Sequence, residues 1–112
     1  MSVARGAKDA REEKYPGRTI RTLLDPKTVG TDGLVLATIT YDPGCEVEPH
    51  THDDQEAIYV IEGRGRAKVG DESVELEPGT AVYIAKGVTH SVVNPNDEPI
   101  EAVLVHAPAR DQ

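Results

Sequence analysis

The apolar and β-branched residues of this chain fall into short runs that are separated by turn residues. The breaks carry Gly, Pro and Asp, as at Pro43-Gly44, Gly70-Asp71 and Pro78-Gly79. Nine such runs with no helical stretch between them predict an all-β sandwich or barrel. The predicted strands span residues 18–24, 34–41, 46–52, 55–62, 65–69, 72–77, 80–85, 90–94 and 100–106.

The first seventeen residues follow a different pattern from the rest of the chain. Arg, Lys, Asp and Glu dominate this stretch, almost nothing in it is apolar, and it stops at Tyr15-Pro16-Gly17. We therefore predict a flexible N-terminal tail, or a short solvated helix, over residues 1–17. A single domain is expected over residues 18–112.

The segment around Gly70-Asp71 predicts a hairpin whose register can be checked on both faces. A two-residue loop pairs Val69 with Glu72. The other pairs are then small or apolar on the inner face and oppositely charged on the outer face: Gly65 with Leu76, Ala67 with Val74, Arg66 with Glu75 and Arg64 with Glu77. The basic residues of this hairpin are therefore better explained as partners of carboxylates than as an anion-binding stripe.

The charge of the chain excludes some classes of partner. Its 112 residues carry 12 Lys and Arg against 20 Asp and Glu, for a formal net charge of −8. This balance argues against nucleic acid and against an anionic membrane surface. No apolar run approaches the roughly 18 residues of a membrane-spanning helix, and the start of the chain lacks a signal-peptide core. We therefore expect a cytoplasmic protein.

Cys45 is the only cysteine of the chain. A single cysteine excludes an internal disulfide and a cysteine-based zinc cluster within one chain. We interpret Cys45 as a small turn residue, and a redox or crosslinking role is the alternative.

Candidate chemistry is concentrated in the central half of the chain. His50 and His52 are two residues apart, so in an extended chain both side chains project from the same face. Glu56 follows after a polar turn, and His90 lies far along the chain after a tight turn. Together these residues would form a mixed nitrogen and oxygen site that suits Fe, Ni, Cu or Zn and, through the carboxylate, Mn. On the residues alone, an exposed strand edge and a turn-capping role for His90 remain open.

The spacing of these residues resembles the two signatures of the cupin superfamily. The first signature matches in full, with gaps of five, one, three and six residues between Gly44, His50, His52, Glu56 and Gly63. The second matches at all but one position, where the family pattern has proline and this chain has alanine. Its residues are Gly79, Ala85, Gly87, His90 and Asn94.

The resemblance implies a small cupin β-barrel, of the double-stranded β-helix or jelly-roll type, with a metal near its centre. By the family pattern the ligands are His50, His52, Glu56 and His90, with one or two positions left for water or substrate. This donor set favours Fe(II), Mn(II) or Ni(II), with zinc or copper as possible substitutes.

The function is less well determined, because cupins host many activities. We favour a metal-dependent enzyme, dioxygenase-like or isomerase-like, that acts on a small organic molecule bound in the barrel. A non-catalytic module that binds or senses a small molecule is the alternative. A third possibility is a protein whose metal only holds the barrel together.

His106 ends the last predicted strand and shares the inward parity of Ile100, Ala102 and Leu104. It could line the mouth of the barrel, but we favour a solvated or locally satisfied histidine at a strand end.

Residues 57–61 and 82–84 are apolar on both faces of their predicted strands. A small barrel buries only the inner face, so the outward Tyr59, Ile61 and Tyr83 need cover. A second subunit or the chain's own N-terminal strand would supply it, and we predict a homodimer.

Overall fold

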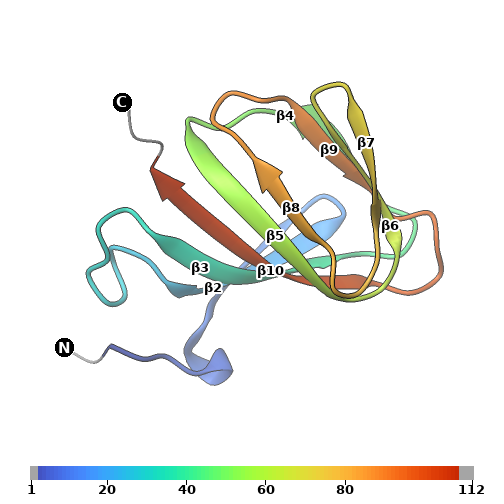
Figure 1. The fold of residues 1–112 in the computed structure, drawn as a ribbon. Coiled ribbons are helices and arrows are strands. Elements are labelled where there is room, and N and C mark those ends of the chain that lie inside the picture. The colour runs from blue at the N-terminus through green and yellow to red at the C-terminus, as the bar shows by residue number, and fades with distance from the viewer. Residues whose placement is uncertain (1–2, 109–112) are drawn as a thin grey trace.

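Residues 3–108, which the computed structural model describes, form ten strands and one 3-10 turn, η1 (Ala7–Asp9). Two antiparallel sheets lie face to face, with strand orders β1-β2-β3-β10-β5-β8 and β4-β9-β6-β7 (Figure 1). The strands are β1 (Arg11–Tyr15), β2 (Arg18–Leu24), β3 (Val35–Tyr41), β4 (Glu46–His50), β5 (Asp54–Glu62), β6 (Gly65–Val69), β7 (Glu72–Leu76), β8 (Ala81–Ile84), β9 (His90–Val93) and β10 (Ile100–Pro108).

The predicted all-β class is confirmed. Each of the nine predicted strands is present, and its ends differ from the prediction by no more than two residues. Within residues 3–108, no helix has the length and the apolar character that crossing a membrane requires.

Within the segment expected as a tail over residues 1–17, Arg11–Tyr15 form strand β1 at the edge of the larger sheet. This strand pairs antiparallel with β2, and all five of its side chains are exposed. Ion pairs support the backbone pairing: Arg11 contacts the buried Asp25 at 2.8 Å, and Arg21 contacts Glu12 at 2.9 Å. Because charged pairs and backbone hydrogen bonds hold β1, its sequence carries no apolar pattern that would reveal a strand.

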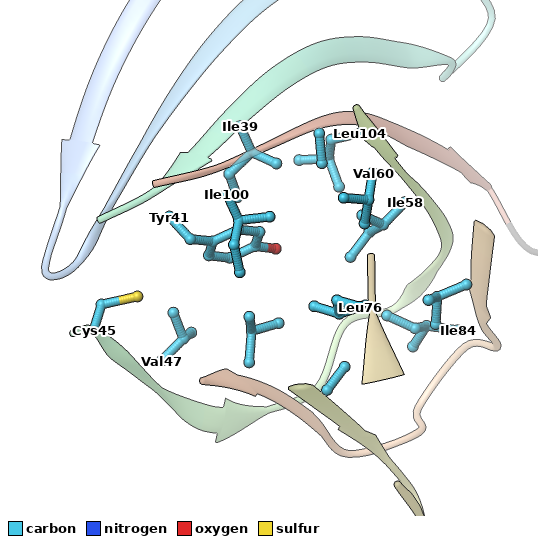
Figure 2. Close-up of a cluster of buried hydrophobic side chains, with 14 of the residues drawn as sticks. Ile39, Tyr41, Cys45, Val47, Ile58, Val60, Leu76, Ile84, Ile100 and Leu104 are labelled. Carbon is cyan, nitrogen blue, oxygen red and sulfur yellow. The ribbon is translucent and has the colours of Figure 1, made fainter. Parts of the chain in front are cut away.

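The hydrophobic core fills the space between the inner faces of the two sheets (Figure 2). Ile39 and Tyr41 on β3 and Leu104 on β10 reach inward from the larger sheet, and Val47 on β4 reaches inward from the smaller one. Along β3 and β10, buried residues alternate with partly buried ones over Ala37–Tyr41 and Ile100–Leu104, as expected for strands with one face toward the core. Apolar packing of this kind holds the sheets at a fixed separation and so fixes the positions of the polar residues between them.

The hairpin of β6 and β7 has the predicted register. Its five pairs run from Val69 with Glu72 to Gly65 with Leu76. On the outer face Arg66 lies 2.8 Å from Glu75, and on the same hairpin Arg64 lies 2.9 Å from Glu77. The arginines are thus paired with carboxylates, as the pattern indicated.

The outer face of the larger sheet carries an exposed apolar patch, which consists of Tyr59, Ile61 and Tyr83. These side chains are 47%, 49% and 62% exposed. Tyr59 and Ile61 lie on β5 and Tyr83 lies on β8, the strand at one edge of the sheet. Strand β1 forms the opposite edge. The chain's own N-terminal strand therefore does not cover the patch.

Candidate metal centre

The pairing of β4 with β9 brings together two histidines that are forty residues apart. His50 is the last residue of β4 and His90 is the first residue of β9, and the two stand directly opposite each other in the ladder. Their ring centroids are 4.3 Å apart. His52 follows just beyond the end of β4, with its ring centroid 4.9 Å from that of His50 and 5.2 Å from that of His90.

A turn with an unusual backbone conformation holds His52 and His90 in place relative to each other. Gly87 has a φ of +77°, and its N–H donates a hydrogen bond of 2.9 Å to the carbonyl oxygen of His52. The N–H of Val88 closes the turn on the carbonyl oxygen of Ala85 at 3.2 Å. The turn thus forms with alanine at the position where the cupin signature has proline, because Gly87 supplies the left-handed conformation.

One ligand atom from each of His50, His52 and His90 lies within 4.8 Å of the others. Backbone carbonyls fix the ring tautomer of two of them: Nδ1 of His50 lies 2.8 Å from the oxygen of Glu48, and Nδ1 of His90 lies 3.0 Å from the oxygen of Val88. A carbonyl only accepts, so each Nδ1 carries the hydrogen and each Nε2 keeps its lone pair. Metal-binding histidines in proteins use this arrangement to orient the ring.

The buried Nε2 of His90 has no hydrogen-bond partner among the described residues. A buried polar atom without a partner is costly in free energy, and a bound cation would satisfy its lone pair. Together with the tautomers of His50 and His90, this atom shows that the three imidazoles fit a divalent transition metal.

Glu56 lies beside this cluster and contacts His90. Its Oε2 atom is 3.3 Å from Nε2 of His90, and its side chain is 7% exposed. Burial acts to raise the pKa of Glu56, but the contacts with His106 and His90 lower it by more, and the pKa is about 2. The carboxylate is therefore charged throughout the physiological range. The structure thus brings three of the four expected ligands into one cluster. A role of Glu56 as the fourth ligand remains an expectation.

His106 lines this site, which was the alternative from the sequence, and its ring is also satisfied locally by the carboxylates of Glu56 and Asp54. Its side chain is 16% exposed, its Nε2 lies 2.8 Å from Oε1 of Glu56, and its ring centroid is 5.2 Å from that of His52. Burial lowers the pKa of His106, but the carboxylates of Glu56 and Asp54 raise it by more. The inward parity of the last strand was the signal for this position, but parity alone does not reveal that Glu56 stands opposite His106 on β5.

All four histidines of the chain line one cavity of about 70 Å³. Its polar lining consists of the histidines, Glu56 and Arg18, and its apolar side includes Ile39, Val47 and Leu104. Tyr41 also lines the cavity, and Figure 2 shows its ring directed toward the centre of the barrel. The site is thus a small, mostly enclosed pocket with a charged carboxylate and lone-pair nitrogens at one wall.

Cys45 and Asn94 are both buried in the protein. Cys45 is buried, and burial raises the pKa of its thiol, which keeps the sulfur in the unreactive protonated form. The fully buried Asn94 donates hydrogen bonds from Nδ2 to the carbonyl oxygens of Tyr41, Asp42 and Glu98. The interpretation of Cys45 as a turn residue is consistent with this burial.

The geometry agrees with a family match. The sequence model of the cupin domain matches residues 37–106, which contain the three clustered histidines, Glu56 and His106. The chain belongs to the cupin family.

Two of the similar proteins have names that refer to polyketides. The tetracenomycin polyketide synthase protein TcmJ of Streptomyces glaucescens is 32% identical, over 96% of this chain and 76% of that protein. The crystal structure of the polyketide cyclase RemF from Streptomyces resistomycificus superposes with a TM-score of 0.81 at 28% identity, over 100% of this chain and 83% of that one.

A more distant structural neighbour is an oxalate decarboxylase with Mn(II) centers from Bacillus subtilis. It superposes with a TM-score of 0.82 at 22% identity, over 100% of this chain and 31% of the neighbour. This likeness concerns the fold.

Proposed function

We propose that this cupin is a metal-dependent enzyme that acts on a small polycarbonyl compound, as expected for a relative of polyketide cyclases. The observation that carries the proposal is the convergence of His50, His52 and His90, with two of the rings fixed by backbone carbonyls. Such an arrangement prepares nitrogen lone pairs for a cation before any cation arrives, which a solvated histidine at a strand edge does not need.

The residues that would hold the metal are the three clustered histidines, with Glu56 as the fourth ligand. A bound divalent metal would supply Lewis-acid stabilisation of negative charge on a substrate oxygen. Mn(II) is the metal we put first, because the carboxylate adds a hard donor and the Bacillus neighbour holds Mn(II). Fe(II) and Ni(II) suit the same donors, and zinc or copper are possible substitutes.

The cavity restricts the part of a substrate that the protein surrounds. Its volume of about 70 Å³ is well below the 300–1,000 Å³ typical of sites that enclose a drug-sized ligand. We therefore propose that the barrel takes a small molecule, or only the reacting end of a longer one. The apolar wall at Ile39, Val47 and Leu104 excludes water from that end, which strengthens every electrostatic interaction there.

A carbon between two carbonyl groups loses a proton readily when the resulting enolate is stabilised. Isomerisation and ring closure of a polycarbonyl chain both begin with such a proton loss and need no oxidant. The similarity to a polyketide cyclase and a polyketide synthase protein thus favours the isomerase-like function over the dioxygenase-like one. A dioxygenase would in addition consume molecular oxygen, which gives a direct way to separate the two.

The test uses ethyl 2-methyl-3-oxobutanoate, a simple dicarbonyl probe, with the Mn(II)-loaded and the metal-free protein. In heavy water, catalysed loss of the C2 proton appears as deuterium incorporation by mass spectrometry, and an oxygen electrode follows any consumption of oxygen. We expect metal-dependent exchange without oxygen uptake, and its loss in His50→Ala. Oxygen uptake would favour a dioxygenase. Tight binding with neither reaction would favour the non-catalytic module.

We also propose that the protein works as a homodimer. The exposed patch of Tyr59, Ile61 and Tyr83 lies on the outer face of the larger sheet, and β1 lies at the far edge of that sheet. A second copy of the chain is the remaining candidate for cover, because contiguous exposed aromatic and aliphatic side chains favour association.

A further inference from the structure

Glu56 is held between two histidines, one at each oxygen of its carboxylate. Oε1 lies 2.8 Å from Nε2 of His106, and Oε2 lies 3.3 Å from Nε2 of His90. The side chain of Glu56 is 7% exposed, so water does not compete freely for either oxygen. The two oxygens therefore have different partners: Oε2 lies beside His90 of the three-histidine cluster, and Oε1 lies beside His106.

His106, the partner of Oε1, is itself fixed by a second carboxylate. Nδ1 of His106 lies 3.2 Å from both oxygens of Asp54. Asp54 and Glu56 are two residues apart on β5, so their side chains project from the same face of the strand. His106 stands on the neighbouring strand β10, directly opposite Glu56. The two carboxylates thus hold one imidazole between them, one at each ring nitrogen.

We infer that His106 is a positioning residue, which occupies Oε1 of Glu56 so that only Oε2 is presented to an ion held by the three clustered histidines. The inference rests on the proposed metal site. A carboxylate without such a partner is free to rotate or to bind a cation through both oxygens. With one oxygen presented, three imidazoles and one carboxylate oxygen leave two positions of a six-coordinate ion open. Two open positions match the two oxygens of a dicarbonyl substrate.

Metal binding alone is enough to test this, without any substrate. The variants are His106→Leu, which removes both ring contacts, His106→Gln, whose amide N–H replaces the Nε2 donor, and Asp54→Asn, which weakens the support of the ring. The matched control is Glu101→Gln. Glu101 lies on the same strand and accepts a 2.8 Å hydrogen bond from Thr40, away from the metal cluster.

Two readouts are measured for each metal-free variant after its fold is checked by circular dichroism. Titration with Mn(II), followed by the paramagnetic resonance signal of the free ion, gives the dissociation constant. The visible absorption of added Co(II) reports changes in its coordination. We expect His106→Leu to weaken Mn(II) binding about 10- to 100-fold and to alter the Co(II) spectrum, as is typical when the partner of a ligand is lost. Asp54→Asn should weaken binding less, while His106→Gln and Glu101→Gln should stay close to the wild type.

A double variant separates an action through Glu56 from direct contact with the ion. In a Glu56→Gln background, His106→Leu should cause no further loss of Mn(II) affinity, because the group that His106 positions is already altered. A further loss of the same size would overturn the inference and make His106 a ligand in its own right. Unchanged affinity and an unchanged Co(II) spectrum in His106→Leu would overturn it too. If His106→Leu does not fold, Asp54→Asn carries the comparison, alone and in the Glu56→Gln background, where it should cause no further loss.

The failure of the proposed function has a different signature. If the wild type does not bind Mn(II) or Co(II), or binds them equally well after His50→Ala, the three-histidine site is wrong and the inference falls with it. If the wild type binds the metal through His50 and only the His106 variants show no effect, the metal site stands and the positioning role alone is rejected.

Discussion

His50 and His90 face each other across two antiparallel strands, with their ring centroids 4.3 Å apart. Both rings have Nδ1 tied to a backbone carbonyl two residues earlier in the chain, at Glu48 and Val88. This shared arrangement orients two of the three rings of the proposed metal site. We expect His90→Ala to weaken binding of Mn(II) by at least about 100-fold, because it removes a ligand and not only a ligand's partner. Calorimetric titration of the metal-free protein measures the change.

The control for this prediction is Val88→Ala. This variant shortens a partly buried side chain two residues before His90. It keeps the backbone carbonyl oxygen that accepts the hydrogen bond from Nδ1 of His90. Equal losses of affinity in the two variants would mean that local packing, and not the imidazole, determines metal binding.

The metal should stabilise the fold in a manner that depends on pH. Burial lowers the pKa of His90, but Glu56 and the carbonyl oxygen of Val88 together raise it by more, so this ring takes up a proton readily when no ion is present. An imidazole binds a metal only when its ligating nitrogen is unprotonated, so protons compete with the ion. The stabilisation by the metal is therefore complete above the pKa of the metal-free ring and fades as the pH falls below it. Thermal unfolding with and without EDTA should show a clear difference in midpoint at pH 7.5 and a much smaller one at pH 5.

A midpoint that does not respond to EDTA at pH 7.5 would contradict this prediction. Metal content of the same samples, measured by elemental analysis, ensures that the comparison starts from loaded protein.

The anchoring of the N-terminal strand should fail in acid. The hydrogen bond from Arg11 lowers the pKa of Asp25 below its ordinary value, and backbone N–H groups of Thr28 and Lys27 act in the same direction. A carboxyl with a lowered folded-state pKa stabilises the fold above its unfolded pKa of about 4, and this contribution is lost as the pH falls through the folded value. Asp25→Asn should mimic the acid form at neutral pH.

Hydrogen exchange measures this effect directly at the amides of β1. We expect several-fold faster exchange there in Asp25→Asn, with little change in β5 or β10. Glu13→Gln is the matched control, because Glu13 is the exposed partner of Arg11 at 3.3 Å. Equal exchange rates in all three proteins would show that backbone pairing with β2 suffices to hold β1.

The comparison of sequence and structure shows which interactions leave a local trace. The hairpin of β6 and β7 was predictable because one register explains both of its faces. That register pairs Ala67 with Val74 on the inner face and Arg66 with Glu75 on the outer face. The three clustered histidines were predictable because their spacing follows the cupin signatures. Strand β1 was not, since Arg11 and its neighbours are charged and exposed. The place of His106 was not either, because it depends on how β10 pairs with β5, a contact across fifty residues.

The exposed patch on the larger sheet should mediate a homodimer. Tyr83 is 62% exposed, and Tyr59 and Ile61 are about half exposed beside it. We expect light scattering at micromolar concentration to give twice the 12.1 kDa mass of the chain. Ile61→Lys should shift the protein toward the monomer, because it places a charge in the centre of an apolar contact. The control Lys68→Glu changes a charge on the other sheet, and a 12.1 kDa wild-type species would disprove the dimer.

The role of Glu56 in turnover is separable from its role in holding the ion. Coordination is the role we favour, and acceptance of a substrate proton is the alternative. Glu56→Gln keeps the size of the side chain, but an amide is a poorer ligand and no base. We expect the variant to lose at least about 10-fold in Mn(II) affinity and to lose metal-dependent exchange of the dicarbonyl probe in parallel. Full metal occupancy with lost exchange would instead assign Glu56 as the base. Full occupancy with unchanged exchange would mean that Glu56 has neither role, and the ligand pattern of the family would not hold at this position.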